Sequence, residues 1–206
     1  MTKRALEHLK ADRVMAEVIQ RVGPLKLRPR RIAPFQSLVH AIIHQQLSGQ
    51  AASTILNRFQ AVFGGRGFPS PHVVAGAEVE KLRAAGLSVA KANYIKGVAQ
   101  GAIEGLVPSL ELCDCLTDDD LIQRLTTIRG VGRWTVHMLL IFNLGRPDVL
   151  PTEDLGVRRG YQIAYKKPSL PEPAQLHRIG VRWMPFRTAA ALYFWRTADF
   201  LKNDAW

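Results

Sequence analysis

The stretch that decides the fold is Leu125–Arg159, LTTIRGVGRWTVHMLLIFNLGRPDVLPTEDLGVRR. It predicts the end of one helix, a tight Gly130-Val131-Gly132 turn, and an apolar helix from about Arg133 to Phe142. The glycines permit positive φ and leave their backbone N–H groups uncovered where the second helix begins. Uncovered amides at a helix N-terminus bind anions, most often phosphate, so this turn is a candidate phosphate site.

The same stretch carries an acidic residue near its end, Asp154. Pro151 and Thr152 precede it as helix-start signals, which predicts that Asp154 lies in a first helical turn. The helix dipole favours an ionised carboxylate at such a position. A simple capping role is the alternative, although Thr152 is available for that role and Glu153 already complements the dipole.

The composition indicates a polyanionic partner. The chain has 206 residues, 47% of them hydrophobic, with a formal net charge of +11 and a pI near 10.2. Such a charge suits nucleic acid or an anionic membrane surface. The charged N-terminus MTKRALEHLKADR does not read as a signal peptide, and no apolar run approaches a membrane span. We therefore expect a soluble cytoplasmic protein, associated with the nucleoid in a bacterium or nuclear in a eukaryote, with no membrane partner.

The rest of the chain reads as helices, so the fold class is all-α. Helices are expected over 5–22, from Pro34 to about Leu47, from after Ser48-Gly49 to about Phe63, and as two short pieces within 71–87. Further helices are expected over the segment that follows Ser88, with Lys91 and Lys96 exposed, and over Asp118–Thr127, where Thr117 and Asp120 have capping-box spacing. The junction HQQLSGQ at 44–50 is a turn with polar groups at its tip.

Four segments in this order resemble one family, the helix-hairpin-helix (HhH-GPD) DNA glycosylases, and most closely their 3-methyladenine DNA glycosylase II branch. They are AIIHQQLSGQAAS at 41–53, the hairpin at 125–140, DVLPTEDLGVRRG at 148–160 and RWMPFRTAAALYFW at 182–195; in addition, Gly86–Ile95 matches the family pattern GLSxxKxxYI. The resemblance implies two lobes with a cleft between them. One would be a helical barrel of 34–145 carrying the hairpin at about 118–142, and the other would combine 1–33 with 146–206.

The resemblance also implies a reaction. Cleavage of an N-glycosidic bond builds positive charge on the sugar, which one fixed carboxylate stabilises, and Asp154 is the candidate catalytic residue. Glu153 is its nearest competitor. Members that also cut the strand carry a lysine where this chain has Trp134, so a monofunctional hydrolase without lyase activity is expected.

Base and DNA contacts follow by motif match. Trp134 and Trp195 are expected to line the base pocket, together with Met138, where a close relative has tyrosine. Gln46, with Leu47 as the alternate, is expected to plug the gap left by the flipped nucleotide, while His44 and Gln45 line the same minor-groove edge. The alternative for Gln45 and Gln46 is that they cap buried backbone groups. Gly130, Gly132 and Arg133 are expected at a DNA phosphate.

No cofactor is expected to be required. In the family a monovalent cation, Na⁺ or K⁺, often bridges the hairpin and the phosphate through main-chain carbonyls that map to Thr126, Ile128 and Gly130. Relatives with an iron–sulfur cluster use four C-terminal cysteines, and residues 161–206 contain none. Cys113 and Cys115 are expected to be thiols. His40 and His44 have a metal-ligand spacing but no evident third ligand.

The implied function is base excision repair of alkylated purines, 3-methyladenine and 7-methylguanine, in double-stranded DNA, by an enzyme expected to be a monomer. Two alternatives stay open. One is a glycosylase of the same fold for deaminated or mismatched bases, and the other is a non-catalytic binder of bent or damaged DNA. Because a pure binder needs neither Asp154 nor the aromatic pocket residues, those residues favour the enzyme.

Overall fold

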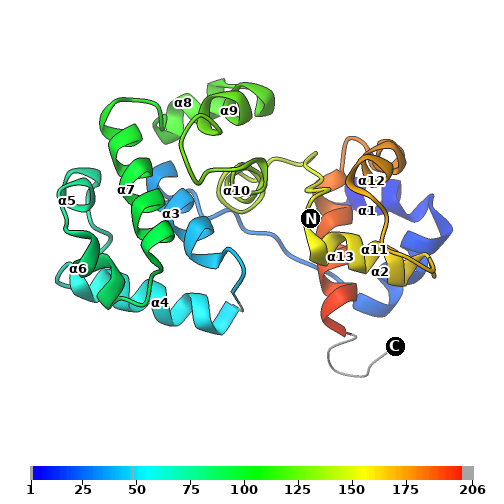
Figure 1. The fold of residues 1–206 in the computed structure, drawn as a ribbon. Helices are drawn as coiled ribbons and strands as arrows, with labels where there is room; N and C mark the ends of the chain where they lie inside the picture. Colours follow the sequence, from blue (N-terminus) through cyan, green and yellow to red (C-terminus); the bar gives the residue numbers. More distant parts are fainter. Residues whose placement is uncertain (1, 48, 201–206) are drawn as a thin grey trace. The chain divides into compact units, whose positions relative to one another are not determined.

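The structure, a computed structural model, describes residues 2–47 and 49–200. All the regular elements of this described part are helical, which confirms the all-α class (Figure 1). The nine elements in the middle of the chain are α3 (Pro34–His44), α4 (Gly49–Val62), α5 (Pro71–Ala75), α6 (Val79–Ala84), α7 (Val89–Ile103), α8 (Leu110–Cys115), α9 (Asp118–Leu125), α10 (Arg133–Met138) and the π-helix η1 (Leu139–Leu144). The others are α1 (Lys3–Lys10), α2 (Arg13–Val22), α11 (Leu155–Ala164), α12 (Pro173–Gly180), the 3₁₀-helix η2 (Val181–Trp183) and α13 (Arg187–Phe200).

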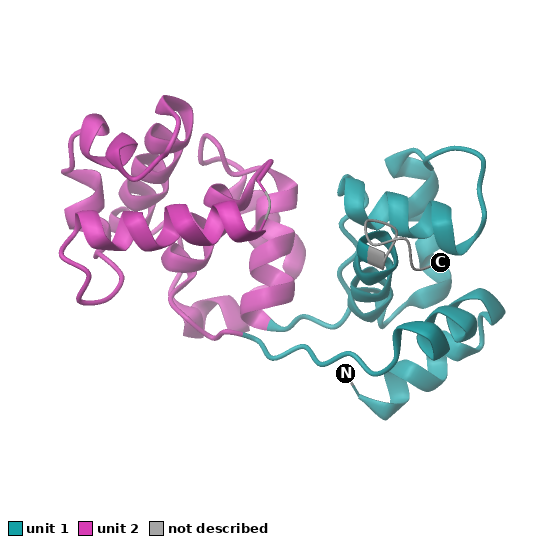
Figure 2. Ribbon diagram, turned by 90° about the horizontal axis from the view of Figure 1, so that it is seen from below, with its two compact units in different colours: residues 1–29, 145–206 teal, residues 30–144 magenta. Residues whose placement is uncertain are grey.

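The chain divides into two compact units (Figure 2). Unit 1 combines residues 1–29 with 145–206, and unit 2 is the intervening segment 30–144. The sequence analysis predicted a division at 34 and 145. The candidate hairpin therefore lies in unit 2, and the candidate carboxylate lies in unit 1.

Unit 1 is built on the pair α11 and α13. Their close approach requires a glycine at position 160, because a Cβ there would collide with the backbone of Phe194. Trp183, Tyr193 and Phe194 are almost completely buried in the resulting core, to which α1 and α2 also contribute. Burial of an aromatic side chain of this size contributes several kcal/mol of hydrophobic free energy, so this core supports the loop that carries Asp154.

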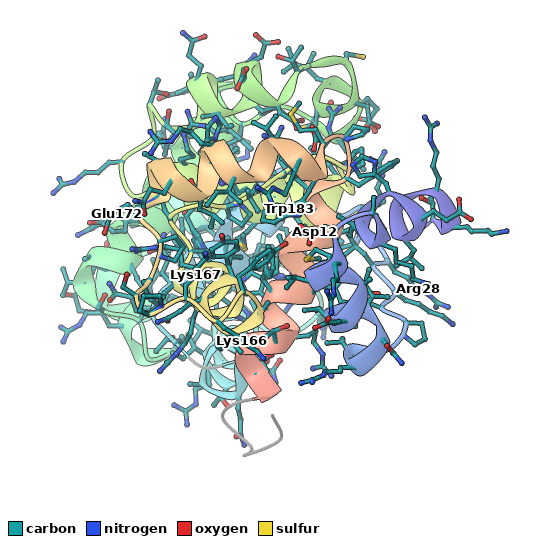
Figure 3. All side chains as sticks on the ribbon, turned by 90° about the vertical axis from the view of Figure 1, so that its right-hand side faces the viewer. Asp12, Arg28, Lys166, Lys167, Glu172 and Trp183 are labelled. Atoms are coloured by element: carbon teal, nitrogen blue, oxygen red, sulfur yellow. The ribbon has the colours of Figure 1, made fainter. Side chains whose placement is uncertain are left out.

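The predicted helix over 5–22 is two helices. Asp12 interrupts it, since its Oδ1 accepts hydrogen bonds from the N–H groups of Val14 and Met15 and so caps α2. The same carboxylate accepts a 2.5 Å hydrogen bond from the Tyr165 hydroxyl. Asp12 and Trp183 lie close to each other (Figure 3). Burial and the carboxylate together raise the pKa of Tyr165. An aspartate inside a helical pattern was the sequence signal for this break.

Unit 2 packs α3 against α7 and η1. Leu38, Val39, Ile42 and Ile43 of α3 are fully buried, which accounts for the helix's nearly continuous apolar sequence. The predicted end at Leu47 is wrong. The helix ends at His44 because Gln45 leaves the helical region with ψ of 125°, and Gln46 then adopts a left-handed backbone conformation with φ of 57°.

The helix predicted to run from Arg133 to Phe142 also differs. It is α-helical only as far as Met138 and continues as a π-helix, η1. The buried Asn143 of η1 accepts a 3.0 Å hydrogen bond from the N–H of Ile32 and donates a 2.9 Å bond to its carbonyl. The Arg30 and Arg31 N–H groups add bonds to the η1 backbone, so the π-helix anchors the segment that enters unit 2.

The described residues support neither a membrane-spanning helix nor a metal site built from side chains. No helix in 2–47 or 49–200 is long and apolar enough to span a bilayer. In the same ranges no group of three or more His, Cys, Asp or Glu side chains is arranged to hold a metal ion.

Candidate nucleic-acid interface and carboxylate site

The hairpin joins α9 to α10 through residues 126–132. Thr117 and Asp120 form the predicted capping box at the start of α9, where the Thr117 hydroxyl and backbone N–H lower the pKa of Asp120. Within the turn, the Val131 N–H donates a 3.0 Å hydrogen bond to the Ile128 carbonyl. A helix, a tight turn and a second helix are thus present as expected.

The two hairpin glycines serve different purposes, contrary to the prediction that both permit positive φ. Gly130 has φ of 89°, and a Cβ there would also collide with the ring of Tyr94 on α7. Gly132 has φ of −89° and caps α10, and a Cβ there would meet nothing within 4 Å. Gly130 is therefore required by the fold, whereas Gly132 leaves open space beside the first amides of α10, which have no acceptor within their own helix.

Helix α7 packs against the hairpin. A Cβ at Gly101 would lie 2.9 Å from Cδ1 of Ile128, and one at Gly97 would lie 3.9 Å from the Arg129 carbonyl. Together with the contact between Tyr94 and Gly130, these positions place one face of α7 against the turn. The family-like pattern at 86–95 is therefore the start of a helix that carries the hairpin, with Ser88 as its N-cap as predicted.

The turn between α3 and α4 presents the candidate plug residues. Gln46 and Leu47 are exposed, whereas His44 and Gln45 are half-buried. Gln45 turns its side chain toward the hairpin, where Nε2 donates to the Gly130 carbonyl at 3.3 Å and to Thr135 Oγ1 at 3.1 Å. Gln45 therefore satisfies a backbone carbonyl, which was the alternative role considered for it. Gln46 and Leu47 remain the candidates to enter DNA.

The expectation that Lys91 and Lys96 are exposed is wrong. The Lys91 ammonium donates hydrogen bonds to the carbonyls of Ile43 at 2.9 Å and Gln45 at 2.7 Å, and burial lowers its pKa. The Lys96 ammonium donates to the carbonyl of Ala77. A helical wheel does not show this, because a long stem lets an ammonium reach acceptors beyond the helix's own surface.

Trp134 and Met138 lie four positions apart on α10, so they share one face. Both are half-buried, while the three residues between them are buried. A partly open pair of an indole and a thioether is a suitable surface for a flat ligand. Arg133, at the start of the helix, is exposed.

In unit 1 the Asp154 carboxylate is held by two donors. Its Oδ1 accepts a 2.9 Å hydrogen bond from the Val157 N–H and a 2.8 Å bond from Nε1 of Trp195 on α13. Asp154 is therefore itself the N-cap of α11, rather than a residue of its first turn, and Thr152 is buried and does not cap. Gly156 makes room for the indole, since a Cβ there would lie 2.8 Å from Trp195 Cδ1.

The loop before Asp154 is braced by the start of α13. Arg187 donates from Nε to Oδ1 of Asp148 at 2.8 Å and from Nη2 to Oδ2 at 3.0 Å. The Thr188 hydroxyl donates to the Arg146 carbonyl and accepts from the Val149 N–H. Both Asp148 and Arg187 are about four-fifths buried, so they are structural rather than a phosphate contact.

The histidine pair at 40 and 44 lies beside the positive charge of Arg30. Arg30 Nη1 lies 3.3 Å from Nδ1 of His40, and burial, aided by the Arg30 charge, lowers the pKa of His40 to about 4. Burial, followed by the charges of Arg30 and Lys91, also lowers the pKa of His44. Cys113 is buried and Cys115 is exposed, and both are thiols.

Comparison with known proteins agrees with this arrangement. The sequence model of the HhH-GPD superfamily base excision DNA repair proteins matches residues 39–185. DNA-3-methyladenine glycosylase 1 of Schizosaccharomyces pombe is 38% identical over 98% of this chain and 91% of its own length.

Solved structures agree as well. The S. pombe 3-methyladenine DNA glycosylase in complex with abasic DNA matches with a TM-score of 0.89 and 38% identity, covering 96% of this chain and 97% of that chain. A DNA-3-methyladenine glycosidase from Bacillus halodurans matches with a TM-score of 0.82 and 32% identity, covering 98% and 92%. On these matches, which include a family model that spans the hairpin and Asp154, the chain belongs to the HhH-GPD superfamily of base excision DNA repair proteins.

Proposed function

We propose that the protein is a monofunctional DNA glycosylase that flips alkylated purines, chiefly 3-methyladenine and 7-methylguanine, out of double-stranded DNA and hydrolyses their N-glycosidic bonds. Membership of the superfamily and the names of the similar proteins support a base-removing enzyme. The observation that carries the proposal is the oriented carboxylate of Asp154, held by Trp195 and the Val157 amide.

Asp154 supplies the negative charge that this reaction needs. As the base leaves, the sugar develops oxocarbenium character, and a fixed carboxylate stabilises that charge more in the transition state than in the ground state. Because two donors already fix Oδ1, little reorganisation is required as the charge forms. Water then adds to the anomeric carbon, and Asp154 either orients this water or acts by its charge alone.

The residue at the family's lysine position supports hydrolysis without strand cutting. Trp134 has no amine, so it cannot form a Schiff base with the sugar. The product is accordingly an intact strand that contains an abasic site.

Base selection rests on aromatic and polarisable side chains. We assign Trp134, Met138 and Trp195 as base-contacting residues. An alkylated purine is cationic, and an aromatic face attracts it by roughly 0.5 to 2 kcal/mol more than a neutral base. Such a base is also a good leaving group, so little acid catalysis is needed.

The hairpin is the proposed phosphate grip, through the backbone N–H groups of Gly130 and Gly132 and through Arg133. A monovalent cation would fit the main-chain carbonyls of Thr126, Ile128 and Gly130 and would supply positive charge toward the phosphate. The Ile128 and Gly130 carbonyls each already accept one hydrogen bond, which leaves each oxygen a second lone pair for an ion. No other cofactor is required, and the protein is proposed to act as a monomer.

The test is release of bases from methylated duplex DNA by the wild type and by Asp154→Asn. We expect the wild type to release 3-methyladenine and 7-methylguanine without cutting the strand and without a borohydride-trapped complex. The variant should lose release while it still binds DNA. Release of uracil or hypoxanthine in place of alkylpurines would favour the glycosylase of other specificity, and DNA binding without any release would favour the non-catalytic binder.

A further inference from the structure

Helix α7 contacts both of the turns that the proposed function assigns to DNA. Its Tyr94 packs against the hairpin at Gly130, as described above. One turn earlier on the same helix, Lys91 reaches the turn between α3 and α4. Residues three apart lie on the same side of a helix, so a single face of α7 supports the phosphate grip and the plug turn together.

The acceptors of Lys91 are the carbonyls at the end of α3. The last carbonyls of a helix have no N–H partner within it, and a positive charge near them is favourable. Lys91 satisfies one of them, that of Ile43, at 2.9 Å, and also the carbonyl of the C-cap residue Gln45 at 2.7 Å. The ammonium therefore fixes the backbone on both sides of His44, immediately before Gln46.

The same turn is held from a second direction by the side chain of Gln45. That amide bonds to the Gly130 carbonyl and to Thr135, which belong to the hairpin and to α10. Gln45 thus carries a backbone bond to Lys91 and a side-chain bond to the hairpin. Between these attachments and α4, Gln46 stands exposed with φ of 57°.

A plug residue works best when its turn is already ordered. Flipping a nucleotide costs a few kcal/mol of stacking and pairing, which the inserted side chain must offset. Any ordering of the turn that is left until insertion adds to this cost. Contacts that order the turn in the unbound protein therefore favour the flipped state.

We propose that Lys91 is a positioning residue for nucleotide flipping, which holds the α3–α4 turn through the carbonyls of Ile43 and Gln45 so that Gln46 is presented to the duplex in register with the hairpin. The inference rests on the proposed base-removing activity. Lys91 touches neither the base nor the sugar, and it acts only through the plug turn.

The test compares two variants of one helix. Lys91→Met keeps most of the side-chain stem and removes the ammonium. Lys96→Met is the matched control, because Lys96 also donates to a backbone carbonyl but at Ala77, which is outside the plug turn. Lys91→Arg restores a cation and should recover part of any loss. Urea unfolding of each variant identifies the conditions under which all are folded.

Single-turnover base release is measured on two duplexes that carry 7-methylguanine, one with cytosine opposite the lesion and one with an abasic-site analogue opposite. Flipping is easier in the second because no base pair has to be broken. We expect Lys91→Met to slow release from the paired lesion by about tenfold, the effect of losing hydrogen bonds to a charged group, and to change release from the unpaired lesion by less than about threefold. Lys96→Met should leave the ratio between the two substrates unchanged.

A fluorescent 2-aminopurine beside the lesion provides a second readout, and its rise on binding should be smaller with Lys91→Met. Equal loss on both duplexes, or no loss on either, would overturn the positioning role, as would a changed substrate ratio in Lys96→Met. If the wild type releases base from neither duplex, it is the proposed function that fails, and the 2-aminopurine signal still decides whether Lys91 assists flipping.

Discussion

The indole N–H of Trp195 donates a 2.8 Å hydrogen bond to Oδ1 of Asp154, which joins the third turn of α13 to the cap of α11. The sequence analysis assigned Trp195 to the base pocket. The structure gives it a further role, since a donor aimed at one oxygen fixes the orientation of the whole carboxylate. Both helices are rigidly packed at Gly160, so the geometry does not depend on a mobile loop.

The first prediction concerns this hydrogen bond. Trp195→Phe keeps an aromatic ring and removes the donor. We expect the single-turnover rate of base release to fall on the order of tenfold to a hundredfold, as a hydrogen bond to a charged group contributes about 1.5–3 kcal/mol. Affinity for DNA containing an abasic-site analogue should change much less.

Trp183→Phe is the control for Trp195→Phe. Trp183 is a buried tryptophan of the same unit that packs against Phe194 rather than binding Asp154. The control should lower the free energy of unfolding and leave the release rate of the folded protein unchanged. An unchanged rate in Trp195→Phe would show that the Trp195 hydrogen bond is not needed to orient the carboxylate.

The second prediction separates the two hairpin glycines. Gly130→Ala should lower the free energy of unfolding by more than about 2 kcal/mol, because an alanine is strained at this φ and its methyl group meets Tyr94. Gly132→Ala should cost about 1 kcal/mol or less, as expected for a changed N-cap in open space. Urea unfolding measures both.

Gly132→Ala, which costs little stability, should have a clear effect on DNA affinity. In Gly132→Ala the new methyl group lies beside the amides proposed to face a phosphate, so affinity should fall by about the 0.5–1.5 kcal/mol of one hydrogen bond. Undiminished affinity, measured by fluorescence anisotropy at fixed salt, would exclude these amides as a phosphate grip.

Local signals were sufficient for much of this fold. The capping residues Ser88 and Thr117 were identified correctly, because a cap depends on neighbours three positions away. The same holds for the start of α10 at Arg133, whereas α9 ends at Leu125 and not at the predicted Thr127. Asp12 was overlooked as a helix break although the same rule applies to it.

Contacts between residues far apart in the sequence could not be predicted from such local signals. Gln45 and Gly130 are 85 positions apart, and Lys91 lies 46 positions from Gln45. Amphipathic patterning placed Lys91 on an exposed face, since it describes where Cβ points and not where a long side chain ends. The change from α- to π-helix at Leu139 has no local sequence signature that we identify.

The third prediction concerns the brace of the aspartate loop. Arg187→Lys removes the paired geometry with Asp148 while keeping the charge, because an ammonium cannot make both planar hydrogen bonds. We expect a loss of about 1 to 3 kcal/mol in the free energy of unfolding, given the partial burial of the pair. A slower base release should accompany it.

A double-mutant cycle tests whether the pair itself is responsible. If Asp148→Asn and Arg187→Gln act through the same interaction, the double variant should be more stable than the sum of the single losses implies. Additive losses would mean that the Arg187 side chain stabilises the loop by packing rather than by the ion pair.

The fourth prediction is a pH dependence of stability. The pKa of His40 is lowered from its ordinary value of 6.5 to about 4 by burial and by Arg30. As the pH falls from 6.5 toward 4, the unfolded chain therefore binds a proton that the folded protein does not. The contribution of His40 to the free energy of unfolding is therefore fully present above pH 6.5 and is lost as the pH falls from 6.5 to about 4. His44, whose pKa is lowered for the same first reason, adds to the loss.

His40→Gln should flatten this dependence, because glutamine does not titrate in either state. The midpoint of urea unfolding would be followed across the window for the wild type, for His40→Gln and for His177→Gln, in which the replaced histidine is exposed. We expect the slope of the midpoint against pH to decrease in the first variant and to match the wild type in the second. A slope that is unchanged in His40→Gln would assign the acid sensitivity to other groups, of which His44 is the first to examine, since burial lowers its pKa from the same ordinary value.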